Sequence, residues 1–313
     1  MDRSEAVNQT QKSKTRKIKL TIPEEEIMSP GHLACQGCGA ALALRYALKA
    51  LGPKTMTAIP ACCWAVIDGP FPYTAAGIPV YHCAFETAAS TAAGISHALA
   101  QSGQDDVTAL AWAGDGGTFD IGLQALSGAA ERGDNIIYIV YDNEAYMNTG
   151  IQRSSATPHG AWTTTTPVKH YKKGAKKNIM EIMVAHHIPF CATANIAYPE
   201  DLTKKLIKAK SMKGTKFIHL YAPCPTGWKH GPEATIKIAR LATETRIFPV
   251  YEVENGVYKI NKKVKNPKNV SEYLMLQGRF RHLSEDEVLY IQKQVDKNWE
   301  RLIKLEEAFG EPM

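Results

Sequence analysis

The fold of this chain is decided by one stretch, which runs from Trp112-Ala-Gly-Asp115-Gly-Gly-Thr-Phe-Asp-Ile-Gly122 to Tyr141-Asp-Asn143-Glu-Ala145-Tyr-Met-Asn148-Thr-Gly150. Residues 107–113 form a short apolar run typical of a buried strand, and the glycines that follow let the backbone approach a ligand closely. Residues 119–132 are typical of a helix, and residues 135–141 of the next buried strand. The stretch therefore predicts a strand–helix–strand unit whose two strand ends lie side by side, where open parallel sheets bind ligands.

Two oxygen-bearing side chains follow these strands. Asn143 comes after Asp115 at the distance of one crossover unit, so both side chains can reach one hard cation. Magnesium prefers oxygen ligands, takes few of them from protein, and leaves the rest to phosphates and water. The pattern therefore favours a diphosphate ester bridged by Mg2+. The alternative is an ordinary strand–helix turn in which Asp115 caps the helix.

The same pattern resembles the thiamin diphosphate motif, in which Gly-Asp-Gly is followed by an Asn one crossover unit later. The resemblance implies that Asp115 and Asn143 bind Mg2+ with their side chains, and Ala145 with its backbone carbonyl. It also implies an α/β thiamin-diphosphate-binding fold with a mostly parallel sheet flanked by helices. The residues expected to bind the cofactor are Gly114, Asp115, Gly116, Asn143, Ala145, Asn148, Thr149 and Gly150.

Composition limits the class of protein. The 313 residues allow one large or two modest domains, and 44% hydrophobic content supports a sizeable core. The net charge of +6, from 37 basic and 31 acidic residues, is a mild excess that does not demand nucleic acid. No apolar run approaches the roughly 20 residues that cross a bilayer, and the N-terminus lacks a signal peptide's apolar stretch. We therefore expect a cytoplasmic protein without a membrane partner.

Three parts are expected along the chain. Residues 1–30 are polar and basic, with lysines and an arginine between positions 12 and 19, and indicate a solvated tail or an arm laid over a partner. Residues 31–230 are expected to form the cofactor domain. Residues 231–313 combine an Asn255-Gly256 hairpin signal with a long charged helix at 284–310, and are interpreted as a subunit-contact extension.

Strand and helix signals alternate elsewhere in the cofactor domain. Residues 152–167 lack periodicity and are rich in turn formers, which predicts a functional or interface loop. The basic cluster at 169–177 has two interpretations. It steers an acidic partner or the phosphates of coenzyme A toward the site, or it is simply a solvated face. The remaining expected elements are helices at 40–51, 85–101, 178–187 and 199–212, and strands at 188–194 and 216–221.

The cysteines suggest a metal site. Seven is an odd count, and a cytoplasmic chain would keep unligated thiols reduced, so a disulfide framework is not expected. Cys35-x-x-Cys38 suits a redox pair, half a zinc site, or two ligands of an iron–sulfur cluster. With one cysteine from the Cys62-Cys63 pair and with Cys224, it makes a plausible four-thiolate site. Zinc has the same ligand demand, so a zinc-stabilised nucleic-acid-binding module is the alternative.

With these cysteines the resemblance becomes specific. Over roughly residues 31–230, the chain resembles the β subunit of a 2-oxoacid:ferredoxin oxidoreductase, the pyruvate synthase group. In that family a Cys-x-x-Cys-Gly motif, a third Cys at the spacing of Cys63 from Cys38, and a distant fourth Cys hold the 4Fe-4S cluster nearest the thiamin. The resemblance therefore implies Cys35, Cys38, Cys63 and Cys224 as cluster ligands, with Cys63 selected over Cys62.

The resemblance also implies the activity. It is the reversible, thiamin-dependent oxidative decarboxylation of a 2-oxoacid, with pyruvate, coenzyme A and oxidised ferredoxin giving acetyl-CoA, CO2 and reduced ferredoxin. Asn148 is expected to form a hydrogen bond near the reacting carbon. Cys62-Cys63-Trp64-Ala65 and Ala40 depart from the pyruvate enzymes, so oxalate, phenylglyoxylate and branched-chain 2-oxoacids remain alternatives.

Partner subunits are implied as well. The motif supplies only the diphosphate half of a thiamin site, and the four cysteines hold only one cluster. The resemblance therefore requires an α-type subunit that carries the aminopyrimidine half-site, and a subunit or domain with further 4Fe-4S clusters.

Overall fold

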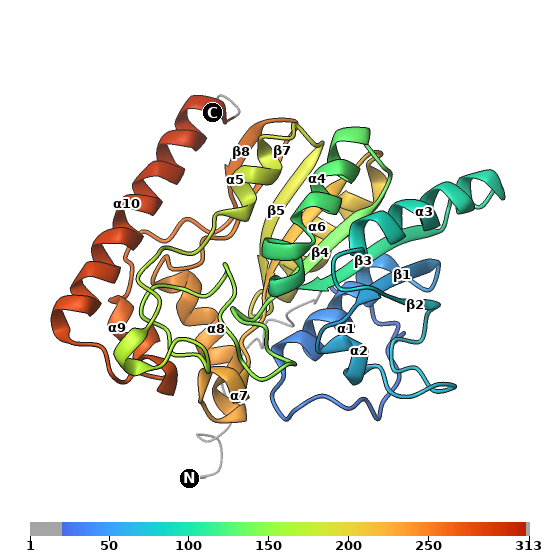
Figure 1. Cartoon of the computed structure of the whole chain (residues 1–313). Helices are drawn as coiled ribbons and strands as arrows, with labels where there is room; N and C mark the ends of the chain where they lie inside the picture. The colour runs from blue at the N-terminus through green and yellow to red at the C-terminus, as the bar shows by residue number, and fades with distance from the viewer. Residues whose placement is uncertain (1–20, 311–313) are drawn as a thin grey trace, which may run out of the picture.

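An eight-stranded sheet forms the centre of the computed structural model, which describes residues 21–310 (Figure 1). The strand order is β2-β1-β3-β4-β6-β5-β7-β8. Strands β1 to β6 run parallel, and β7 and β8 complete one edge in antiparallel pairing. This confirms the mostly parallel sheet. The strands are β1 (Thr55–Pro60), β2 (Val80–Cys83), β3 (Thr108–Gly114), β4 (Ile137–Asp142), β5 (Phe190–Asn195), β6 (Lys216–Tyr221), β7 (Tyr251–Glu254) and β8 (Val257–Ile260).

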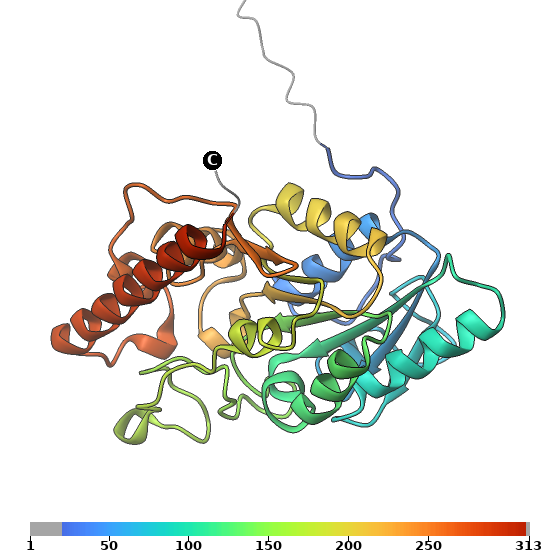
Figure 2. The same ribbon diagram turned by 90° about the horizontal axis from the view of Figure 1, so that it is seen from above.

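Helices cover both faces of this sheet (Figure 2). Helices α1 (Gly39–Leu51) and α6 (Pro199–Ser211) pack together on one face, while α3 (Ala88–Gln101) and α4 (Leu123–Arg132) cover the other. Strands β4, β5 and β6 are buried along their whole length, because side chains that alternate along a strand meet helices on both sides. Ile139, for example, packs in the α1 and α6 core, whereas its neighbour Tyr138 packs in the α3 and α4 core.

Shorter helices and one long helix complete the chain. The longest, α10 (Glu285–Phe309), lies where a long charged helix was expected and begins at a capping box between Ser284 and Glu287. Within residues 21–310, no helix is both long and apolar enough to cross a bilayer. The other helices are α2 (Trp64–Ile67), α5 (Ile179–Val184), α7 (Pro225–Trp228), α8 (Thr235–Glu244) and α9 (Val270–Leu274), with 3-10 turns at Val168–His170, Pro232–Ala234 and Gly278–Phe280.

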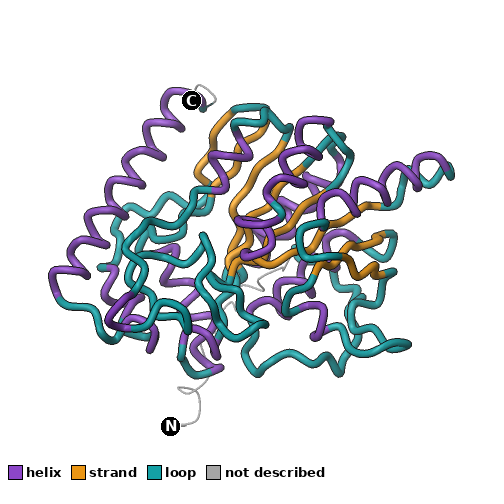
Figure 3. Tube along the Cα trace, in the orientation of Figure 1, coloured by secondary structure: helices purple, strands orange, loops and turns teal. Residues whose placement is uncertain are grey.

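The segment between β4 and α5 is mostly irregular (Figure 3). Residues 152–167 contain no helix or regular strand, as the turn formers predict. The hairpin of β7 and β8 turns at Asn255 and Gly256, which both have positive φ, +49° and +84°. Both central residues of a type I′ turn need that conformation, which explains the Asn-Gly signal.

Several element boundaries differ from the sequence expectation. The helix expected from residue 119 begins as a π-helical turn, Gly117–Ile121, and α4 follows only at Leu123. A Cβ at Gly122 would lie 2.4 Å from the carbonyl oxygen of Gly117, so the chain is too tight there for any other residue. Helix α3 begins at Ala88 rather than residue 85, and α5 ends at Val184 rather than 187. Strands β1 and β2 are not among the elements expected from the sequence; β2 has only four residues and is half exposed at the sheet edge.

The described part of the N-terminal arm lies along α1. Lys49 Nζ donates to the carbonyl oxygens of residues 23–25 at 2.9–3.2 Å. Arg45 binds Glu26 through two hydrogen bonds of 2.9 and 2.7 Å. Residues 21–30 therefore pack on their own domain, while the basic residues between positions 12 and 19 lie outside the described residues.

Candidate active site

Four neighbouring strands end at one edge of the sheet and carry the candidate residues. Strands β1, β3, β4 and β6 are adjacent and parallel, so their carboxyl ends meet at the same edge. Cys63 follows β1, Asp115 follows β3, Asn143 follows β4 and Cys224 follows β6. The two strand ends expected to lie side by side do so, with Gly114 directly opposite Tyr141.

Three oxygen-bearing groups converge at the end of β3 and β4. One terminal atom of the Asn143 side-chain amide lies 2.9 Å from Asp115 Oδ1 and 3.2 Å from the Ala145 carbonyl oxygen. With nitrogen at this position the amide donates to both oxygens. With oxygen there, two side-chain oxygens and one carbonyl meet at a single point, which is a donor set that Mg2+ prefers. The chemistry of these groups therefore fits the metal that the motif implies.

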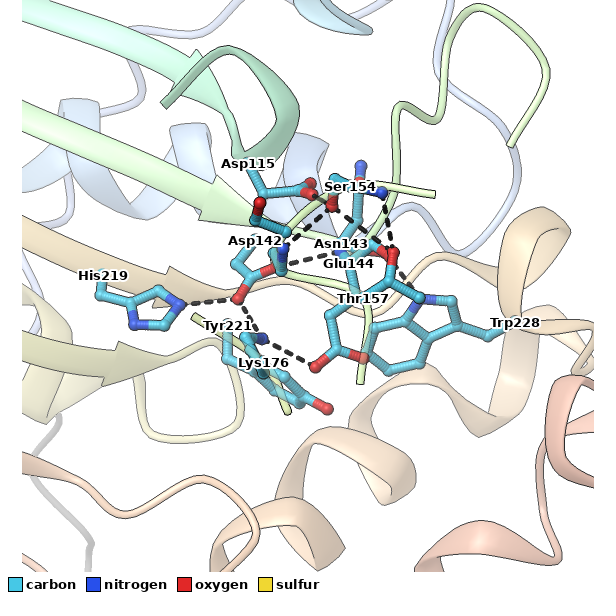
Figure 4. Close-up of polar contacts among 12 residues, drawn as sticks. Asp115, Asp142, Asn143, Glu144, Ser154, Thr157, Lys176, His219, Tyr221 and Trp228 are labelled. Atoms are coloured by element: carbon cyan, nitrogen blue, oxygen red, sulfur yellow. Dashed lines mark hydrogen bonds and ion pairs between the residues drawn. The ribbon is translucent and has the colours of Figure 1, made fainter. Parts of the chain in front are cut away.

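The charge at this point is unbalanced. Asp115 is 0% exposed, and Ser154 Oγ donates to its Oδ2 at 2.6 Å (Figure 4). Burial, reinforced by the nearby Asp142 carboxylate, raises the pKa of Asp115 well above its usual range. No lysine, arginine or histidine in the described residues forms an ion pair with Asp115, whereas Asp142 is paired with Lys176 and His219. A bound cation would offset the desolvation cost of the Asp115 carboxylate.

A pocket of about 240 Å3 opens at this edge. Gly116 lets the Tyr146 ring lie against the backbone, since a Cβ at residue 116 would be 2.4 Å from a ring carbon. Gly150 is not part of the lining. The pocket brings most of the expected cofactor residues together with the second cysteine pair; its lining is Ala61, Cys62, Cys63, Phe85, Gly114, Asp115, Gly116, Gly117, Tyr141, Asn143, Ala145, Tyr146, Met147, Asn148 and Thr149.

The cysteine loops also meet. The N–H of Gly39 donates to the carbonyl oxygen of Pro223 at 3.1 Å. Gly39 directly follows Cys38, and Pro223 directly precedes Cys224. A Cβ at Gly39 would lie 2.6 Å from that oxygen, so only glycine allows this approach. Burial raises the pKa of the Cys224 thiol to about 11, with Cys38 and Cys35 adding to the rise. Metal binding would have to displace the thiol proton, because a cysteine binds metal as the thiolate.

The two adjacent cysteines face different surroundings. Burial raises the pKa of the Cys63 thiol, and its neighbours Cys62, Cys224 and Cys38 raise it further, so Cys63 lies near Cys38 and Cys224. Cys62 lies instead against Gly114 and Tyr141. Within residues 21–310, no three His, Cys, Asp or Glu side chains gather as closely as a single metal ion requires. Assignment of Cys35, Cys38, Cys63 and Cys224 as cluster ligands stays a prediction.

Sequence reasoning missed the polar groups beneath the site. Trp228 donates its indole N–H to the Asn143 carbonyl oxygen at 2.7 Å, and Arg279 binds Glu144 at 2.5 Å. Neither residue lies in a motif. Ser154 lies in the loop expected to be functional, which was the only available signal for it.

The basic cluster is partly internal rather than a single solvated or steering face. Lys172 Nζ donates to the carbonyl oxygens of Ser155 and Thr157, and Lys176 binds Glu144 at 2.8 Å. Lys177 donates to a backbone carbonyl, while residues 169 and 173 are exposed. Lys172, Lys176 and Lys177 thus bind backbone carbonyls or Glu144 in the loops around the site.

Known proteins identify the family. Residues 67–220 match the family model described as "Thiamine pyrophosphate enzyme, C-terminal TPP binding domain". The chain is 54% identical over 304 residues to the Pyrococcus abyssi "Ketoisovalerate oxidoreductase subunit VorB", covering 94% of this chain and 98% of that protein. It is 52% identical over 282 residues to the Methanothermobacter thermautotrophicus "Pyruvate synthase subunit PorB", covering 88% and 97%.

A solved structure shares the fold. The 2-oxoglutarate:ferredoxin oxidoreductase from Magnetococcus marinus, with 2-oxoglutarate, coenzyme A and succinyl-CoA bound, aligns with a TM-score of 0.56 and 18% identity, over 72% of this chain and 82% of that one. Membership of this family removes the nucleic-acid-binding alternative. The match over nearly the whole chain confirms the resemblance found in the motifs, and the chain belongs to the β subunits of the 2-oxoacid:ferredoxin oxidoreductases.

Proposed function

We propose that this chain is the thiamin-binding subunit of an enzyme that oxidatively decarboxylates a 2-oxoacid and passes the electrons to ferredoxin. The observation that carries the proposal is the convergence of Asp115, Asn143 and the Ala145 carbonyl in the pocket that Cys63 also lines. A cofactor that releases electrons and an acceptor that takes them one at a time must lie close together. Cys63 lines the pocket that also contains Asp115 and Asn143, so the two candidate sites lie next to each other.

The role of this chain's residues toward thiamin diphosphate is placement. Asp115, Asn143 and Ala145 would hold Mg2+ and, through it, the diphosphate, and Ser154 would orient the Asp115 carboxylate. Thiamin diphosphate, when bound, supplies the carbanion chemistry of decarboxylation. Gly114 and Gly116 leave room for the backbone to approach the cofactor, and the exposed Asn148 at the pocket rim would donate a hydrogen bond near the reacting carbon.

Cys35, Cys38, Cys63 and Cys224 would hold one 4Fe-4S cluster. Support comes from the contact between residues 39 and 223 and from the position of Cys63 in the thiamin pocket. The Gly227 N–H donates to Cys224 Sγ at 3.4 Å, the kind of bond that tunes a cluster thiolate. Zinc could occupy four thiolates but could not accept an electron, so it would leave the proposed reaction without its acceptor.

Other subunits would complete the enzyme. We expect an α-type subunit with the aminopyrimidine half-site and a subunit or domain with further clusters, and coenzyme A as the acyl acceptor. Pyruvate is the first candidate substrate. Ketoisovalerate is the second, because relatives of similar identity carry both names.

The decisive experiment is anaerobic viologen reduction by the purified heteromeric complex. Pyruvate, ketoisovalerate, phenylglyoxylate and oxalate are compared, each with and without coenzyme A. We expect coenzyme A-dependent reduction with pyruvate or ketoisovalerate and none by this chain alone. Failure of every 2-oxoacid with a fully loaded complex would refute the proposed function, and turnover by the isolated chain would refute the heteromeric assignment.

A further inference from the structure

Glu144 lies between Asn143 and Ala145, the two residues of this loop proposed to bind Mg2+, and has an unusual conformation. Its φ is +65°, a region that non-glycine residues rarely adopt unless surrounding contacts hold them there. Its N–H donates to Asp142 Oδ1 at 3.0 Å, and its carbonyl oxygen accepts a hydrogen bond from Thr157 Oγ1 at 2.7 Å. The reversed chain direction at Glu144 lets the Ala145 carbonyl return to within 3.2 Å of the Asn143 amide.

Two cations hold the Glu144 side chain, which is 3% exposed. Lys176 Nζ donates to Oε1 at 2.8 Å, and an Arg279 guanidinium nitrogen donates to Oε2 at 2.5 Å (Figure 4 shows the Lys176 arm). Each carboxylate oxygen therefore has its own cation. Because a buried ion whose partner is removed is left without compensation, the loss of either cation should release Glu144 from this position.

Arg279 reaches the same loop by a second contact. Its guanidinium lies 3.8 Å from the centre of the Trp228 ring, and Trp228 donates to the Asn143 carbonyl oxygen. Arg279 is itself 2% exposed, and its Nε donates to the Gln277 side-chain oxygen at 3.0 Å. Arg279 therefore contacts Glu144 directly. It also packs on the Trp228 ring, which holds Asn143.

We propose that Arg279, supplied by the C-terminal extension, is a positioning residue that holds Glu144 in place and thereby places Asn143 and Ala145 for Mg2+. This inference rests on the proposed function of the same loop. It assigns a role at the thiamin site to residues 231–313, which carry no recognisable motif. The role is indirect, because Arg279 contacts Glu144 and Trp228 rather than the pocket.

The test uses the heteromeric complex, stripped of metal with a chelator and supplied with thiamin diphosphate. Mg2+ is titrated while thiamin diphosphate binding is followed by calorimetry. Arg279→Met should raise the Mg2+ concentration for half-saturation by about tenfold or more, the size expected for a group that orients metal ligands. Arg279→Lys, which keeps the charge, should show a smaller rise. Arg281→Met removes an exposed arginine two residues away and should change nothing.

A purely structural role predicts a different pattern. It would lower the thermal midpoint of the cofactor-free complex but leave the Mg2+ requirement of Arg279→Met equal to that of Arg281→Met, and this result would overturn the inference. If Arg279→Met does not assemble, Glu144→Gln and Arg279→Lys carry the same comparison. The wild-type titration separates the two proposals, because a complex that binds no thiamin diphosphate refutes the proposed function before Arg279 is considered.

Discussion

The indole N–H of Trp228 donates to the backbone carbonyl oxygen of Asn143 at 2.7 Å. Trp228 closes the short helix α7, which begins directly after Cys224, so one hydrogen bond joins the loop of the fourth candidate cluster ligand to the candidate metal loop. Both residues are buried, and the bond is therefore shielded from water. The loops that carry the two candidate sites are thereby joined directly.

Replacement of Trp228 by Phe should weaken this junction. The ring remains to pack on Tyr221, but the buried Asn143 carbonyl loses its donor, which costs about 1–3 kcal/mol of unfolding free energy. Denaturant unfolding and Mg2+ titration of the complex measure the two expected losses. Trp162→Phe leaves the Asn143 bond in place and serves as the control; equal behaviour of the two variants would contradict the assigned role.

Replacement of Asp115 by Asn should separate stability from cofactor binding. The variant removes a buried, unpaired carboxylate whose pKa burial already raises, so the cofactor-free complex should be as stable as wild type or more stable. The thermal stabilisation by thiamin diphosphate with Mg2+ should disappear, because ligand stabilisation follows affinity. Asp106→Asn, at the opposite end of β3, is the control. Full cofactor stabilisation in Asp115→Asn would exclude Asp115 as a metal ligand.

The adjacent cysteines should differ in iron content. Cys63→Ser removes the side chain near Cys38 and Cys224, and should lower iron and acid-labile sulfide in the complex, with loss of the cluster's electron paramagnetic resonance signal. Cys62→Ser alters a side chain that lies against Gly114 and Tyr141, and should retain both. Loss of iron in Cys62→Ser but not in Cys63→Ser would instead assign Cys62 as the third ligand.

Asn148→Ala should affect turnover rather than cofactor binding. A hydrogen-bond donor aimed at a reacting centre typically contributes about a hundredfold or more to kcat. Because Asn148 is an exposed residue at the pocket rim, its loss should leave the thiamin diphosphate affinity and the thermal midpoint close to wild type. Steady-state kinetics with saturating 2-oxoacid measure kcat. An unchanged kcat would show that Asn148 is not catalytic.

The central unit of the fold was predictable because its signals are local. The apolar runs that end at Gly114 and Asp142 are buried on both faces, so their composition marks them as strands. The Asn255-Gly256 hairpin and the start of α10 at Ser284 depend on turn and cap chemistry within a few residues. The π-helical start after Gly116 was not predicted, because the hydrogen bond from the Gly122 N–H to the Gly117 carbonyl oxygen leaves no periodic signal in the sequence.

By itself, the sequence determined the parallel sheet, the family, and the residue types offered for a metal, a diphosphate and a cluster. Motif spacing carries that information because neighbouring parallel strands end at one edge. Only the tertiary structure decided which groups support the site: Arg279 lies 135 positions from Glu144, and Trp228 lies 85 from Asn143. Buried ion pairs and indole hydrogen bonds over such separations form when packing closes the core, and they leave no periodic pattern in the chain.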